Sequence, residues 1–131
     1  MTFPLPLAKL LRLQWLFAAL AFGFLIASGL TALIAGAPLS AAPVAASLVM
    51  FTLYATSLKL PGMGRVGWYR LAMIPAIVVF GGGGVIANVV QNGLDDYASV
   101  PVFVVAVGIN LYGTILNIIV ALGLYRTEDV A

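Results

Sequence analysis

The chain has 131 residues, of which 63% are hydrophobic and 8% charged, with six Lys and Arg residues against four Asp and Glu. Soluble domains carry roughly 25% charged residues, so this composition excludes an ordinary soluble fold and indicates a membrane protein. A net charge of +2 gives no basic footprint for nucleic acid. The absence of His and Cys excludes disulfides, the usual zinc, haem and iron–sulfur ligands, and a Ser–His catalytic pair.

The first uncharged run covers residues 13–58 and is long enough for two membrane-spanning helices. A helix needs roughly 20 residues to cross the hydrocarbon core, and this run has more than twice that length. Glycine and proline gather in its middle, in the stretch AGAPLSAAP, and both residues are poor inside helices. We therefore predict helices at about 13–35 and 42–59.

Two further uncharged runs predict two further helices. The third run follows the turn-like stretch PGMGR and ends at Asp95 and Asp96, which places a helix at about 69–92. The fourth run closes at Arg126 and places a helix at about 98–125. The predicted fold is all-α, with four transmembrane helices in a compact bundle that forms a single domain over residues 1–131.

The basic residues predict the orientation of the bundle. With four crossings, all six fall on one side of the membrane, and the opposite loops carry none; they are Lys9, Arg12, Lys59, Arg65, Arg70 and Arg126. Lys and Arg collect on the cytoplasmic side of short loops. We therefore predict a multi-pass protein of the cell inner (plasma) membrane, of bacterial type, with both termini in the cytoplasm.

The N-terminus has a second interpretation, as a secretory signal that is cleaved near the small residues Ala35-Gly36-Ala37. Signal peptides have an apolar region of roughly 7–15 residues, whereas the apolar run here covers residues 13–34. This length favours a retained membrane span.

Small and amide-bearing residues inside the predicted helices are the candidates for a site. In lipid, small residues allow helices to approach closely, and amides form hydrogen bonds between helices. The first helix carries a ridge of small residues, and the third and fourth helices carry stripes of glycines and amides. The candidate residues are Gly23, Ala27, Gly81, Gly84, Asn88, Gln91, Asn92, Asn110, Gly113 and Asn117.

These residues have two interpretations. The first is helix packing, which we favour because no ionisable group accompanies the amides. The second is a polar pathway or a solute site formed by the amides of the third and fourth helices. The four consecutive glycines from Gly81 to Gly84 are equally ambiguous: they fit close packing, and they also fit a local unwinding or hinge of the kind found in transporters.

The function predicted from the sequence is a small non-enzymatic accessory or scaffold subunit that acts through helix–helix packing in the lipid bilayer, as a homo-oligomer or in a larger membrane complex. The alternative is a small oligomeric transporter or channel for a polar or neutral solute. An intramembrane enzyme ranks third, because it depends on the adjacent carboxylates of Asp95 and Asp96 alone. We predict no cofactor and no metal ion.

Overall fold

The computed structural model describes residues 4–40, 43–92 and 97–127, and at residues 91 and 92 it describes the backbone only. Within these residues, four helices are long and apolar enough to cross a membrane, which indicates a multi-pass membrane protein. The candidate spans are Leu7–Ala35, Val44–Met63, Val66–Val90 and Val100–Ala121. They contain, in this order, α1 (Leu7–Ala35), α2 (Val44–Ser57), the third helix, which begins with α3 (Val66–Ala76), and α4 (Val100–Ala121). A helix suits such apolar sequence because it satisfies its backbone hydrogen bonds internally.

The helix ends differ from the predicted ones by a few residues. α1 begins directly after Pro6, earlier than predicted, and the charged side chains of Lys9 and Arg12 lie exposed on its first turns. Long basic side chains reach outward in this way while their stems cover apolar surface. α4 ends earlier than predicted, and Gly123 follows it with a positive φ of 74°, a conformation that favours glycine.

The third helix changes its hydrogen-bonding pattern within its length. After α3 it continues as two π-helical stretches, η2 (Ile77–Ile86) and η3 (Asn88–Asn92). Pro75 precedes the change, and a proline inside a helix lacks the N–H that the regular α pattern requires. The four glycines therefore lie in a continuous helix of π type. π-Helical stretches are rare in proteins as a whole. Those that do occur are often found at functional sites.

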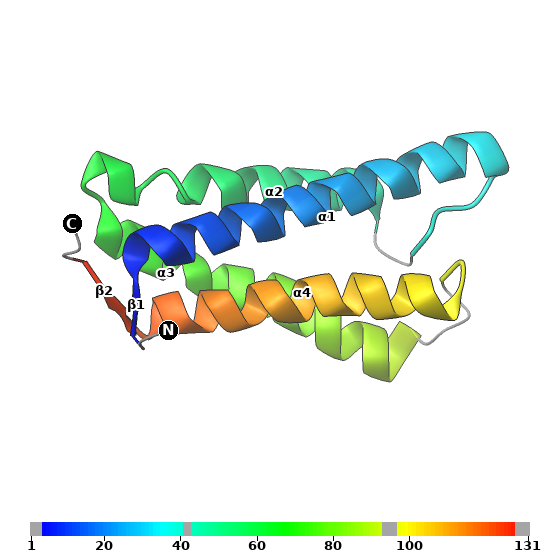
Figure 1. Ribbon diagram of the computed structural model, residues 1–131. Helices are drawn as coiled ribbons and strands as arrows, with labels where there is room; N and C mark the ends of the chain where they lie inside the picture. The colour runs from blue at the N-terminus through cyan, green and yellow to red at the C-terminus, as the bar shows by residue number, and fades with distance from the viewer. Residues whose placement is uncertain (1–3, 41–42, 93–96, 128–131) are drawn as a thin grey trace.

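The helices form two layers, one of α1 and α2 and the other of the third helix and α4 (Figure 1). α1 packs on α2 and on α4, and α4 also packs on α3 and η2. Both termini and the α2–α3 connection lie at one end of the bundle, which we call the termini end (Figure 1). Lys9, Arg12, the basic residues of the α2–α3 connection and Arg126 are at this end.

Hydrogen bonds link separate segments of the chain at both ends of the bundle. At the termini end, β1 (Leu5–Pro6) and β2 (Tyr125–Arg126) pair in parallel, and Arg126 Nε donates to the Pro4 carbonyl at 2.8 Å. At the opposite end, which we call the loop end, Ala98 N donates to the Leu39 carbonyl at 2.9 Å. The loop that follows α1 is therefore tied to the segment that precedes α4.

An aromatic cluster of Phe17, Phe51, Tyr54 and Phe80 fills the middle of the bundle. The rings of Phe51 and Phe80 are stacked with centroids 4.3 Å apart, and Phe17 meets both Phe51 and Tyr54 edge-on at 5.4 Å. Such offset and edge-on pairs are the favoured arrangements of aromatic rings. The cluster joins α1, α2 and η2, and it separates the loop half of the bundle from the termini half.

Candidate functional site

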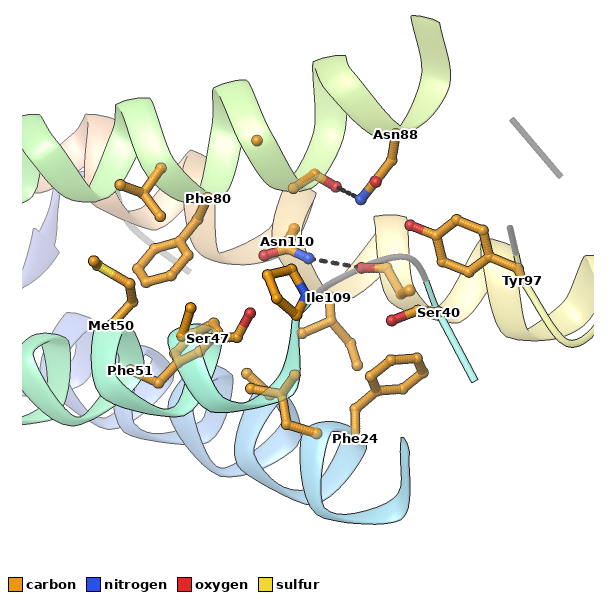
Figure 2. Close-up of a pocket in the computed structure, with 18 residues that line it drawn as sticks. Phe24, Ser40, Ser47, Met50, Phe51, Phe80, Asn88, Tyr97, Ile109 and Asn110 are labelled. Atoms are coloured by element: carbon orange, nitrogen blue, oxygen red, sulfur yellow. Dashed lines mark hydrogen bonds between the residues drawn. The ribbon is translucent and has the colours of Figure 1, made fainter. Parts of the chain in front are cut away.

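A cavity of about 300 Å³ lies in the loop half of the bundle, between all four helices (Figure 2). Phe51 and Phe80 of the aromatic cluster form its deep wall, and Ser40 and Tyr97 line it at the loop end. Most of the other lining residues are apolar. Ligand sites in proteins typically have this character, apolar walls with a few placed polar groups, and volumes from about 300 Å³ upward.

Two amides predicted as site residues line this cavity. Asn88 lies on η3 and is 6% exposed, and its Nδ2 donates to the Gly84 carbonyl at 2.8 Å. Asn110 lies on α4 and is half-buried, and its Nδ2 donates to the Ala106 carbonyl at 3.0 Å. Each amide group is thereby oriented by the backbone of its own helix. The stripes predicted on the third and fourth helices do meet here.

Ser47 and Asn110 offer unused hydrogen-bonding capacity to the cavity. In the part of the chain that the structure describes, neither the Ser47 hydroxyl nor Asn110 Oδ1 has a side-chain hydrogen-bond partner. They come from α2 and α4, and Figure 2 shows both directed into the same space. A hydroxyl both donates and accepts, and an amide oxygen accepts. Together they suit a ligand group such as a hydroxyl, ester or amide.

None of the described residues that line the cavity is Asp, Glu, Lys or Arg. Asp95 and Asp96, which precede the lining residue Tyr97, lie outside the described residues. An isolated ion is very costly to bring out of water without a charged partner. The described lining residues therefore suit a neutral ligand group. The same described residues contain no group of three or more His, Cys, Asp or Glu side chains that could hold a metal ion.

Three of the predicted glycines mark close contacts between helices. A Cβ added at Gly81 would lie 2.9 Å from Cγ2 of Thr114, and one at Gly84 would lie 2.5 Å from Cγ of Asn110. A Cβ at Gly113 would overlap the ring of Phe17. These glycines let α4 approach η2 on one side and α1 on the other. The Gly84 carbonyl also accepts the hydrogen bond that orients the Asn88 amide at the cavity.

The remaining candidates lie elsewhere. Gly23 and Ala27 face outward on α1 with Ala19, and a Cβ added at Gly23 would meet nothing within 4 Å. The side chains of Gln91 and Asn92 lie outside the described residues, as do Asp95 and Asp96.

Asn117 belongs to a separate buried network in the termini half, beyond the aromatic cluster. Its Oδ1 accepts hydrogen bonds from Gln14 Nε2 at 3.1 Å and from the Tyr54 hydroxyl at 2.6 Å. The Tyr69 hydroxyl donates to Gln14 Oε1. Each helix supplies one side chain, so this network joins all four. We call it the four-helix network: Gln14, Tyr54, Tyr69 and Asn117.

Gln14 and Tyr69 of this network were not among the residues predicted for a site. Gln14 is the one amide in a long apolar run, and it shares a helix face with the buried Phe17 and Ala21. A single polar side chain on an apolar helix face is a usable signal for an interhelical hydrogen bond. Tyr69 lies beside Arg70 and has the position of an interfacial aromatic, yet it is fully buried.

Comparisons of the chain with known protein families, with curated proteins and with solved structures found no match. The geometry of the cavity and of the helix contacts therefore carries the functional argument.

Proposed function

We propose that this protein is a small, non-enzymatic membrane transporter. The cavity of the loop half is its binding site for a small neutral solute. The observation that carries the proposal is the cavity itself, where Ser47 and Asn110 offer hydrogen bonds between apolar walls and none of the described lining residues is charged. It develops the alternative predicted from the sequence, a small oligomeric transporter or channel for a polar or neutral solute with its site at the amides of the third and fourth helices.

The orientation of the site follows from the charges. The basic residues gather at the termini end, so the positive-inside rule assigns that end to the cytoplasm of the cell inner membrane. The cavity then lies in the outer half of the bundle. A solute would reach it from the outer side or from the outer leaflet, and the aromatic cluster would bar its way to the cytoplasm.

Transport also requires a part of the protein that moves. The aromatic cluster rests on Phe80 of η2, in the π-helical stretch that contains the glycines. Glycine restrains the backbone least of all residues, and π-helical turns inside helices are frequently found at functional sites. We propose that a shift of η2 moves Phe80 and opens the path past the cluster.

Two adjacent glycines provide a matched test of solute binding. Gly83 lines the cavity and Gly82 does not, and a Cβ added at either position would meet nothing within 4 Å. Gly83→Leu should fill the cavity, whereas Gly82→Leu makes the same chemical change beside it. The measurement is native mass spectrometry of small molecules retained by the protein in lipid nanodiscs.

We expect the unmodified protein and Gly82→Leu to retain the same neutral molecule and Gly83→Leu to lose it. Equal retention by all three proteins would place the bound molecule outside the cavity. If none of them retains a molecule, the proposal of a solute site is contradicted.

The accessory subunit predicted from the sequence is the second candidate function. The observation that favours it is the ridge of Ala19, Gly23 and Ala27, which lies exposed on α1 and is free to meet another helix. Gly81, Gly84 and Gly113, by contrast, make their contacts inside this chain. A larger complex should lose its other subunits in Gly23→Leu but keep them in Gly108→Leu, where a Cβ also meets nothing.

A further inference from the structure

A second cavity, of about 180 Å³, lies between α2 and the third helix, next to the first. Met50, Val79 and Phe80 line both cavities. From these shared residues the second cavity extends toward the termini end, as far as Ser57 on α2 and Ala72 on α3. The two cavities therefore share a wall of residues and follow the length of α2.

The described lining of the second cavity suits an apolar ligand group. Apart from the shared residues, its apolar lining consists of Leu53, Ala72, Pro75 and Ala76. Its two polar side chains are satisfied within the protein: the Ser57 hydroxyl donates to the Tyr54 carbonyl at 2.6 Å, and the Tyr54 hydroxyl donates to Asn117 Oδ1. An apolar chain is the ligand part that fits such a lining.

We propose that the two cavities together bind a single-chain amphiphile with a neutral, hydrogen-bonding head group, an inference that rests on the proposed solute site. The head group lies between Ser47 and Asn110, and the chain enters the second cavity when the proposed shift of η2 moves Phe80, which lines both cavities. Ser47 and Ser57 are ten residues apart on α2, which corresponds to about 15 Å along a helix. This length suits a chain of medium size.

The polarity of the site matches that of the outer leaflet in the proposed orientation. The polar groups lie nearer the loop end and the apolar cavity lies deeper in the bundle, so the ligand keeps the direction that it has in the membrane. A phospholipid is a poorer occupant, because no Lys or Arg lines either cavity to meet its phosphate. A neutral monoacyl lipid has the required polar head group and apolar chain, and it carries no phosphate.

The test uses two probes with the same head group, glycerol monolaurate and glycerol monobutyrate, and measures their binding to the protein in nanodiscs. Ala72→Leu narrows the second cavity from the α3 side, where Ala72 is half-buried. Its matched control is Ala45→Leu, because Ala45 is exposed on α2 and lines neither cavity. Leu53→Trp is the second variant, because Leu53 is 62% exposed at the rim of the same cavity and tolerates a larger side chain.

We expect Ala72→Leu and Leu53→Trp to weaken the binding of monolaurate by about tenfold, the loss that corresponds to excluding about two methylene groups. Binding of monobutyrate should not change, and Ala45→Leu should bind both probes normally. If both variants bind monolaurate as the unmodified protein does, the chain site is contradicted while the solute site stands. If the unmodified protein binds neither probe, the amphiphile is contradicted, and the solute site is judged by Gly83→Leu alone.

Discussion

Gln14 of α1 donates a hydrogen bond to Asn117 of α4 over 3.1 Å, at a fully buried point where all four helices meet. The same Gln14 side chain accepts from the Tyr69 hydroxyl of α3 and contacts the sulfur of Met73 at 3.3 Å. Asn117 in turn accepts from Tyr54 of α2. One amide pair therefore fixes the mutual positions of the helices in the termini half.

Replacing Gln14 by Leu tests how much this network contributes to the free energy of unfolding. The change leaves the Tyr69 hydroxyl without its acceptor and removes one of the two donors to Asn117 Oδ1. A buried polar group without a partner costs about 1–3 kcal/mol, so the free energy of unfolding should fall by about that amount. The measurement is an unfolding titration in mixed micelles.

The control for this prediction is Thr52→Val on α2. The Thr52 hydroxyl is exposed and bonds to the Leu48 carbonyl of its own helix. Its loss should change the free energy of unfolding by less than about 0.5 kcal/mol. Equal stability of the Gln14 and Thr52 variants would show that the network does not hold the bundle together.

Gly113 and Gly108 of α4 form a second matched pair. A methyl group at Gly113 would overlap the ring of Phe17, whereas one at Gly108 would meet nothing within 4 Å. Gly113→Ala should therefore lower the free energy of unfolding by about 1–3 kcal/mol through overpacking. Gly108→Ala should leave it unchanged or raise it by up to about 1 kcal/mol through helix propensity. Thermal unfolding of both variants in one detergent measures the difference, and the same sign for both would contradict the α1–α4 contact.

Fusion reporters test the proposed orientation. A reporter placed after Gly36 lies at the loop end, and one placed after Arg126 lies at the termini end. The positive-inside rule predicts activity of a periplasmic reporter at the first position and of a cytoplasmic reporter at the second. A cytoplasmic signal at Gly36 would reverse the orientation and place the cavity in the inner half.

The number of helices and their order were predictable because glycine and proline mark the first turn and charged residues mark the second and third. The positions of Asn88 and Asn110 at one site were also predictable, since each lies on a glycine-bearing helix face. Asn117 lies on the same stripe as Asn110 but seven residues further along, which is about 10 Å on a helix. That distance carries it past the aromatic cluster into a different network.

Other features depended on packing and could not be predicted from residue patterns. The π-helical geometry of η2 has no signal in hydrophobicity, and Pro75 indicates only that the regular pattern is disturbed. The outward position of Gly23 and Ala27 depends on which face of α1 buries Gln14 and Phe17. The second cavity arises where the small side chains of Ala72 and Ala76 face α2.

The central claim is that the cavity of the loop half takes up a neutral ligand, and one cysteine tests it most directly. The chain has no cysteine of its own, so Ser47→Cys places a single thiol on the cavity wall. Thr52→Cys on the exposed side of α2 is its control. The measurement is the rate at which a small membrane-permeant thiol reagent labels each variant in nanodiscs, with and without glycerol monobutyrate or monolaurate. The account predicts that a probe slows labelling at position 47 in proportion to its occupancy and leaves position 52 unaffected. Labelling of Ser47→Cys at an unchanged rate with both probes at saturating concentration, together with no neutral molecule retained by the unmodified protein in native mass spectrometry, would contradict it.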